Sequence, residues 1–128
     1  MNSVGYGTNT KGEHFDLDQI YEKVKTDYFN SINNKPGLMW NRVITKRKLG
    51  HYNADTDTVM ISIALDKDDT PDFLIEYVMY HELLHKQIGF IHKNHKRYAH
   101  TPEFHAAEKK FEKYAQVKAY LKQRRMMG

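Results

Sequence analysis

The sequence predicts an α+β domain in which three main helices pack on a small antiparallel or mixed sheet of three to four strands. Apolar residues recur at spacings of three and four near both ends of the chain and in its middle, as on one face of a helix. Between the first two such segments, short runs rich in β-branched residues alternate with other residues, as in strands. This order is typical of helices packed on one small sheet.

The first helix is expected to begin at Asp16. Asp16 and Gln19 form a capping pair at its start, and the turn-forming residues 33–37 end it. Residues 1–13 hold three glycines and several small polar residues, so we expect them to form a flexible N-terminal arm. The apolar face of the helix consists of Leu17, Ile20, Tyr21, Val24, Tyr28 and Ile32.

Strands are expected at residues 38–46 and 58–65, and residues 47–52 can form a third strand between them. In the run 58–65, β-branched residues at positions 59, 61 and 63 alternate with other residues, which is the period of a strand. The polar residues 66–69 close this region as a loop.

Two further helices begin with the same capping chemistry. Thr70 and Thr101 are each followed by Pro at the first helical position and by an acid in the first turn. The helix after Thr70 is apolar on nearly all sides as far as Gly89, so it belongs in the centre of the domain. The helix after Thr101 keeps one apolar face, with Phe104, Ala107, Phe111, Tyr114, Val117 and Leu121.

The composition indicates one folded domain. Of 128 residues, 40% are hydrophobic and 28% are charged, which is typical of a globular protein with a small core. The absence of cysteine excludes disulfides and thiolate ligands, so any metal must be held by His, Asp or Glu. Apolar runs are too short for a membrane span. The polar N-terminus does not read as a secretory signal, and a cytoplasmic location is the default expectation.

His81, Glu82 and His85 lie together in the apolar second helix. Histidines four residues apart project from one helix face about one turn apart, so both rings can bind the same Zn²⁺. Glu82 then lies beside the metal, where it can accept a proton from the metal-activated water and pass it to the leaving amine. The pattern predicts a zinc-dependent peptidase with His81 and His85 as ligands and Glu82 as general base. Hydrogen-bonded core histidines are the alternative, but burying these three groups without a ligand carries a large desolvation cost.

A catalytic zinc site usually takes three protein ligands and leaves a fourth position for water. His100 is the favoured third ligand, because it directly precedes the Thr-Pro start of the last helix and its backbone is therefore held rigidly. His105 and Glu108, which lie inside that helix, remain as alternatives. His92 and His95 lie in a basic, polar loop, where solvated histidines are the ordinary expectation.

Two segments carry a family resemblance: YHELLH at residues 80–85 and HTPEF at residues 100–104. Together they resemble the gluzincin-like zinc peptidases and look most like the minigluzincins. They are also similar to SprT-type proteins, in which His, a small residue, two variable positions and Phe form the second motif. The resemblance implies a zincin-like fold with a central active-site helix, a histidine third ligand and kinship with the catalytic domains of HtpX-type membrane peptidases.

One residue departs from the SprT-type pattern, because Thr101 stands where glycine is usual. The chain also has no cysteine-based zinc ribbon. Both observations favour a minigluzincin over a DNA-repair protease.

In gluzincin-like enzymes the substrate is similarly thought to add as a strand to the sheet edge above the zinc. Here residues 49–54 or 59–64 would form that edge, with Asn53 and Ala54 as the favoured contacts. Tyr98, His92 and His95 are candidates for stabilising the oxyanion, although zinc itself can suffice.

Residues 14–116 are expected to form the catalytic domain and residues 117–128 a basic C-terminal tail. This tail either frays, blocks its own cleft, or exchanges with a second molecule to give a homodimer. The resemblance adds weight to blocking, since minigluzincins are described as including latent forms blocked by their C-terminal segments.

Three functions remain open. The leading hypothesis is a metallopeptidase that uses Zn²⁺ to cleave peptides or unfolded protein segments. The second is a SprT-like protease associated with nucleic acid through the basic tail, within a chain of formal charge +4. The third is a non-catalytic zinc-binding module. Glu82 argues against the third, because a structural site needs no general base and closes its fourth position.

Overall fold

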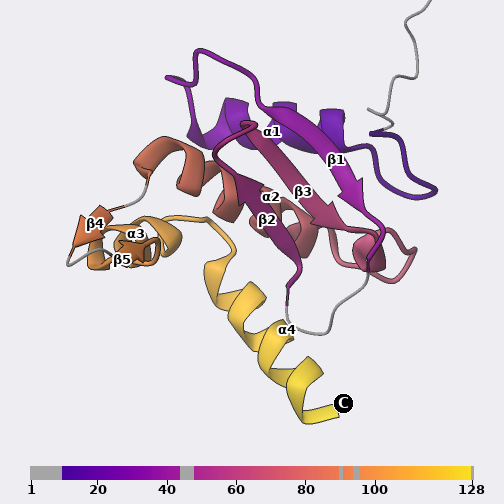
Figure 1. Ribbon diagram of the computed structural model, residues 1–128. Helices are drawn as coiled ribbons and strands as arrows, with labels where there is room; N and C mark the ends of the chain where they lie inside the picture. The colour runs from indigo at the N-terminus through magenta and orange to yellow at the C-terminus, as the bar shows by residue number, and fades with distance from the viewer. Residues whose placement is uncertain (1–9, 44–47, 90, 94–95, 128) are drawn as a thin grey trace, which may run out of the picture.

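The computed structural model describes residues 10–43, 48–89, 91–93 and 96–127, apart from the side chains of residues 91–93, 96–98 and 125–127. These residues form four α-helices, a three-stranded mixed sheet and a two-stranded hairpin, which confirms the predicted α+β class. In chain order (Figure 1) the elements are α1 (Leu17–Tyr28), β1 (Gly37–Asn41), β2 (Gly50–Asn53), β3 (Thr58–Ser62), the 3-10 helix η1 (Ile63–Leu65), α2 (Asp72–Ile88), β4 (Ile91–Lys93), β5 (Lys96–Tyr98), α3 (Pro102–Glu108) and α4 (Tyr114–Met127).

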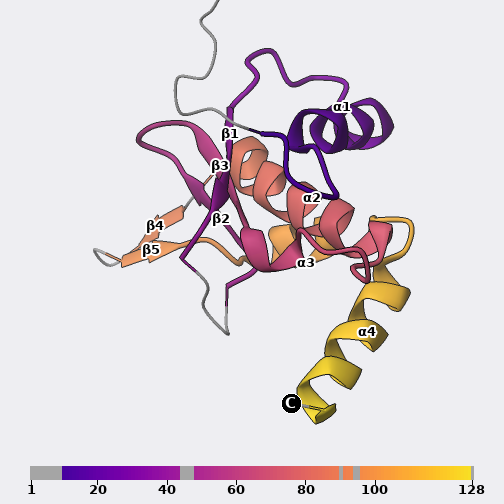
Figure 2. The ribbon, with the colours of Figure 1, turned by 90° about the vertical axis from the view of Figure 1, so that its right-hand side faces the viewer.

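Helix α2 lies at the centre of the domain, as its nearly all-round apolar sequence predicts. It contacts β2 and β3 of the sheet as well as α1, α3 and α4. Figure 2 shows the strands on one side of α2 and α1 on another. Its buried residues are Leu74, Ile75, Tyr77, Val78, Met79, Tyr80, Glu82, Leu83, Leu84 and His85.

The three-stranded sheet has the order β1-β3-β2, so β3 is its central strand (Figure 1). β1 pairs with β3 in parallel, with Trp40 opposite Ile61, and β2 pairs with β3 antiparallel, with Tyr52 opposite Val59. Val59 and Ile61 are fully buried, so the expected alternation is observed. β3 ends at Ser62, earlier than expected, because the Ser62 side chain accepts a hydrogen bond from Ala64 N and starts η1.

The C-terminal helix predicted from Thr101 is two helices in the structure, so the described residues form four α-helices where three main ones were expected. α3 ends at Glu108, and residues 109–113 form turns before α4 begins. The turn places Phe111 in the core, where its ring lies 5.4 Å from the ring of Tyr77 and 5.3 Å from that of Tyr80. Burial of this ring explains the break better than local helix propensity, which continues through the segment.

The helix ends follow the predicted caps with two exceptions, one of which is that α1 ends at Tyr28, before the residues 33–37 that were expected to end it. Asp16 caps α1 by accepting from Asp18 N, and Thr101 caps α3 by accepting from Phe104 N. Gly89 ends α2 with φ of 81°, which favours glycine. The prediction of Thr70 as a cap was wrong, because α2 begins one residue later with Pro71 at the N-cap and without a side-chain cap.

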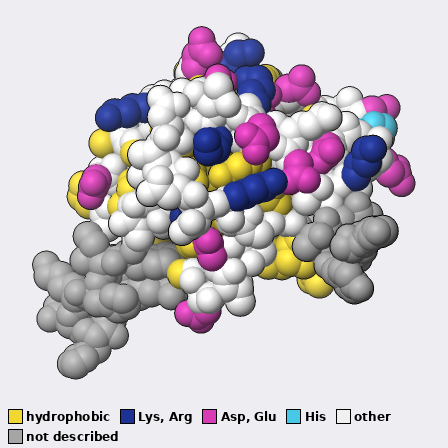
Figure 3. All heavy atoms as spheres, turned by 90° about the horizontal axis from the view of Figure 1, so that it is seen from above, with side chains coloured by type: hydrophobic (Ala, Val, Ile, Leu, Met, Phe, Trp, Pro, Cys, Tyr) yellow, Lys and Arg dark blue, Asp and Glu magenta, His cyan; other side chains and the backbone are white. Residues whose placement is uncertain are grey.

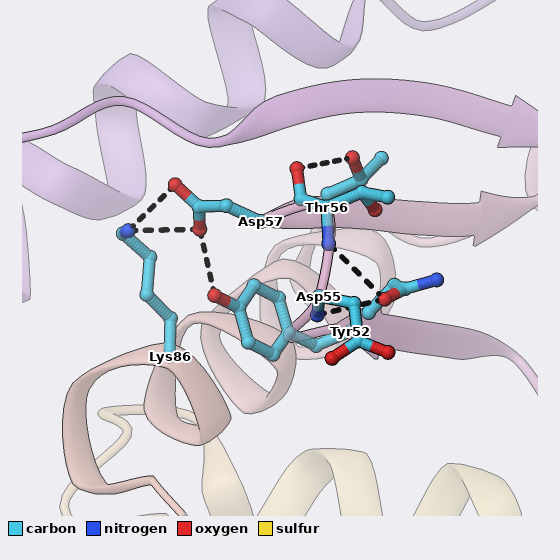
Figure 4. Close-up of polar contacts among 7 residues, drawn as sticks. Tyr52, Asp55, Thr56, Asp57 and Lys86 are labelled. Atoms are coloured by element: carbon cyan, nitrogen blue, oxygen red, sulfur yellow. Dashed lines mark hydrogen bonds and ion pairs between the residues drawn. The ribbon is translucent and has the colours of Figure 1, made fainter.

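A polar lock ties the β2–β3 turn to the end of α2 (Figure 4). The Lys86 ammonium donates to both carboxylate oxygens of Asp57, at 2.8 and 3.0 Å, and the Tyr52 hydroxyl donates to the same carboxylate at 2.6 Å. Asp57 adopts φ of 50°, and its carbonyl accepts from Gly37 N at the start of β1. The lock therefore holds the hairpin over the helix that carries the two histidines.

The chain before α1 is anchored from residue 10 onward. The Thr10 carbonyl accepts from the Trp40 indole at 2.9 Å and from Leu17 N at 3.0 Å.

The upper side of the molecule carries Lys, Arg, Asp and Glu side chains with both signs interspersed (Figure 3). Among the described residues, no helix has both the length and the apolar character needed to cross a membrane.

Helix α4 runs away from the rest of the domain in both views (Figures 1 and 2). Its first half is attached to the core, because Val117 is fully buried. The expected domain boundary between residues 116 and 117 therefore falls inside this helix.

Candidate active site

His81 and His85 project from one face of α2, as their four-residue spacing requires. Their ring centroids lie 4.9 Å apart. The His85 ring stacks on Phe104 at a centroid distance of 4.4 Å, and Phe104 is fully buried. Core packing thus holds this histidine in place.

His100 reaches the same place from the segment between β5 and α3. Its ring lies 5.5 Å from that of His81 and 5.0 Å from that of His85. One potential ligand atom from each of the three histidines lies within 4.8 Å of the others, so they could hold a metal ion. Within the described part of the chain, His105 and Glu108 do not belong to this cluster.

The cluster fits a catalytic zinc ion by its donor chemistry. Three imidazoles are a known ligand set of catalytic zinc, which leaves one position open. Burial lowers the pKa of His85 to about 4, and the nearby His81 and His100 act in the same direction. Burial also lowers the pKa of His100, again with help from His81. Neutral imidazole is the form that binds metal, so these surroundings favour coordination.

Glu82 lines the same cleft as the three histidines and is only 4% exposed. Burial raises the pKa of its carboxyl to about 7, against the opposing influence of His81 and Lys48. A carboxyl that titrates near neutrality is suited to accept a proton and to return it. Gly50 in β2 lies close by, because a Cβ at that position would be 2.9 Å from Glu82 Oε2.

Glu108, the last residue of α3, contacts His81 of the histidine cluster. Its Oε2 accepts from the Tyr77 hydroxyl at 2.6 Å and lies 3.0 Å from His81 Nδ1, while Oε1 lies 2.9 Å from His105 Nδ1. Burial alone would raise the pKa of this carboxyl, but the hydrogen bonds from His81 and Tyr77 outweigh it and lower the pKa to about 2. Glu108 is therefore an anion bonded to a histidine of the cluster.

The cleft beside these residues has a volume of about 420 Å³. Residues 48–52, in β2 and just before it, line the cleft together with the three histidines and Glu82. Leu74, Tyr77 and Val78 of α2 form an apolar part of the lining, to which Leu121 of α4 also contributes.

The other predicted site residues lie away from the cleft lining or outside the residues that the structure describes. Asn53 and Ala54 are not among the described residues that line the cleft, and the Asn53 side chain instead accepts from Asp55 N and Thr56 N in the turn. The side chains of Tyr98 and His92, and all of His95, lie outside the described parts.

The sequence patterns did not indicate the contacts of Gly50 and Tyr77 with the site residues, and they indicated Glu108 only as a candidate ligand. The contacts of Gly50 and Glu108 with α2 join residues more than twenty positions apart. No local spacing indicates such contacts.

Comparison with known proteins agrees with this geometry. The sequence model of the SprT-like family matches residues 17–123, which include the three-stranded sheet and all three clustered histidines. The fold is similar to the crystal structure of the metallopeptidase zymogen jannalysin of Methanocaldococcus jannaschii, with a TM-score of 0.63 and 16% identity. That match covers 89% of this chain and 94% of the other, and shows a shared zincin-like fold. No curated protein matches the sequence. These findings confirm the resemblance carried by residues 80–85 and 100–104.

Proposed function

Because the chain belongs to the SprT-like family, we propose that it is a zinc-dependent peptidase acting on peptides or unfolded protein segments. The observation that carries the proposal is the position of Glu82, a buried carboxyl in the same cleft as the three histidines. A zinc site that only stabilises a fold has no need of such a group beside its ligands.

In this mechanism His81, His85 and His100 would hold the zinc ion. When bound, zinc supplies Lewis acidity that lowers the pKa of the attacking water and polarises the scissile carbonyl. Glu82 accepts the proton of that water and transfers it to the leaving amine. The burial of Glu82 favours this exchange, because it raises the pKa of the carboxyl to about 7, near the pH of a neutral solution.

The outer edge of β2 is the proposed binding edge for substrate. β3 pairs with β1 on one side and β2 on the other, so residues 59–62 have no edge to offer. β2 lies at the end of the strand order and borders the cleft. An extended peptide added there would bind through backbone hydrogen bonds, which demand no particular sequence.

Helix α4 is proposed to restrict the cleft in the full chain. Leu121 contributes to the apolar part of the lining, and the ring of its neighbour Tyr120 packs against Phe73 at a centroid distance of 6.1 Å. The structurally similar jannalysin was crystallised as a zymogen, which supports latency here. Exchange of α4 between two molecules would block the cleft equally and would produce a homodimer.

Association with nucleic acid is a second candidate function, supported by the exposed Lys118, Lys122 and Arg124 on α4. Phosphate contacts make such binding strongly dependent on salt. Failure of the full chain to bind duplex DNA at low ionic strength would remove this candidate.

The peptidase proposal is tested with Glu82→Gln, in the full chain and in a chain ending at Tyr120. The variant should keep its fold and zinc, because Glu82 is not a ligand, while peptide hydrolysis falls on the order of 10²–10⁴-fold. Hydrolysis of an unstructured fluorogenic peptide and metal content measure the two effects. Glu76→Gln, on α2 outside the cleft lining, is the matched control and should behave as the parent.

Two results would contradict the proposal. One is equal hydrolysis by the parent and Glu82→Gln, and the other is a parent that hydrolyses nothing in either length. The ligand set is checked by metal content in the same preparations. His100→Ala should lose tightly bound zinc, whereas His105→Ala should keep it.

A further inference from the structure

We propose that Glu108 is the positioning residue of the metal centre: its carboxylate orients His81 so that Nδ1 carries the proton and Nε2 is left for the metal. The inference rests on the proposed zinc site. It concerns a residue at the end of α3, outside both segments that carry the family resemblance.

Glu108 is buried and lies against several polar side chains. The residue is only 7% exposed, and its carboxylate lies 3.0 Å from His81 Nδ1. The hydroxyl of Tyr77, one helical turn before His81 on α2, donates to the same oxygen at 2.6 Å. Tyr77 thus fixes the oxygen that faces His81. The carboxylate cannot rotate without losing both contacts of Oε2, with Tyr77 and with His81.

An ionised carboxylate can only accept hydrogen bonds. The contact with His81 therefore selects the neutral tautomer with the proton on Nδ1, which puts the lone pair on Nε2. Histidine side chains in water favour the opposite tautomer. Glu108 consequently removes a competing state before metal binds, and its charge increases the basicity of the ring. Carboxylates that hold ligand histidines in this way typically contribute 10- to 100-fold to metal affinity.

The third partner of Glu108 provides a built-in comparison. His105 lies 2.9 Å from the other carboxylate oxygen, but its side chain is 59% exposed. A water molecule can replace it there, so loss of His105 should leave the bond to His81 intact. A purely structural anchor between α2 and α3 would affect stability without affecting the His81 tautomer.

The first experiment determines the tautomer of His81 in the metal-free protein. Nitrogen–proton correlation spectra of the imidazoles are recorded at about pH 8.5, where an ordinary histidine is neutral. We expect the proton of His81 on Nδ1 in the parent and in His105→Ala, and a shift towards Nε2 in Glu108→Gln. A parent His81 with its proton on Nε2 would overturn the proposal without need of any variant.

The second experiment measures zinc affinity by competition with a chromophoric chelator. Glu108→Gln preserves the size of the side chain, and we expect it to bind zinc 10- to 100-fold more weakly than the parent. His105→Ala should stay within about twofold. Thermal unfolding of the metal-free forms distinguishes a loss of fold from a loss of His81 orientation. Tyr77→Phe keeps the carboxylate and should therefore weaken zinc binding less than Glu108→Gln does.

The outcomes distinguish this inference from the proposed function. A parent that binds no zinc would overturn the metal centre and the role of Glu108 together. A parent that binds zinc tightly, with unchanged affinity in folded Glu108→Gln, would overturn only the role of Glu108.

Discussion

Glu82, the proposed general base, lies against a residue that has no side chain. Gly50 in β2 allows the strand to approach α2 so closely that a Cβ would lie 2.7 Å from Val78 Cγ1 and 2.9 Å from Glu82 Oε2. Real Cβ atoms do not approach other atoms this closely without displacing them. At Gly50, therefore, the strand proposed to bind substrate packs directly against the carboxylate proposed to move the proton.

Gly50→Ala is expected to lower kcat/KM for peptide hydrolysis by roughly tenfold or more, because a displacement of about 1 Å in a reacting group is costly. The metal content should remain that of the parent, since the atoms nearest to the added Cβ belong to Val78 and Glu82 and not to a histidine. Steady-state hydrolysis and metal analysis of the same preparation measure both quantities.

Gly37→Ala is the matched control, because its added Cβ would lie 3.2 Å from Thr58 Oγ1 in the sheet and does not contact the cleft. It should hydrolyse peptides as the parent does. Indistinguishable rates for the two alanine variants would show that Gly50 does not position Glu82.

At the scale of elements, polar locks connect segments that do not share a helix or a sheet. The Tyr52–Asp57–Lys86 lock joins the β2–β3 turn to α2, as described above. A second lock involves Asp66, just after η1, whose carboxylate accepts from the backbone N–H groups of Glu13, His14 and Phe15. This lock places the start of α1 against the end of the sheet region.

Asp66→Asn should reduce the free energy of unfolding at neutral pH by about 1.5–3 kcal/mol, the range for hydrogen bonds to a charged group. Burial alone would raise the pKa of Asp66, but the hydrogen bonds from His14, Glu13 and Phe15 outweigh it and lower the pKa. The extra stability is therefore fully present above the ordinary Asp value of about 3.9. It is lost as the pH falls through the lower pKa of the folded state.

Urea unfolding of the metal-free parent and variant at neutral and acidic pH measures this difference. The gap between the two proteins should be largest at neutral pH and should close in acid. Asp68→Asn, at an exposed position in the same loop, should change little at either pH. A gap that widens on acidification would contradict the assignment.

At the scale of the whole molecule, α4 connects the core to the cleft. Val117 is fully buried, whereas Leu121, one turn further on, contributes to the cleft lining. Truncation before Val117 would thus damage the core as well as open the cleft. Removal of the chain after Tyr120 keeps Val117 and removes only the part proposed to restrict access.

The chain ending at Tyr120 is expected to hydrolyse peptides at least severalfold faster than the full chain, because the apolar part of the cleft becomes accessible. Leu121→Ala should give a smaller increase, and Lys122→Ala, at the exposed neighbouring position, should give none. Hydrolysis and molar mass by light scattering distinguish blocking within one chain from exchange in a dimer. A folded, zinc-loaded truncation that is no faster at any concentration would eliminate α4 as an inhibitor.

Much of the fold and the centre of the site could be predicted from local patterns. The α+β class, the central position of α2 and the cap at Thr101 follow from residue types at short spacings. The same holds for His81 and His85, whose common helix face is a property of helical geometry. The position of His100 beside them was predicted from its cap, because a short-range feature fixed its backbone.

Other features depend on contacts between residues far apart in the chain. The break between α3 and α4 follows from burial of Phe111 among α2 aromatics, and β2 is an edge only because β1 pairs with the far side of β3. The bond from Glu108 to His81 spans 27 residues. Spacing within an element records which face a side chain occupies, whereas the partner on that face depends on how separate elements pack. For this reason the three clustered histidines and Glu82 were predictable, and the contacts that Glu108 and Gly50 make with them were not.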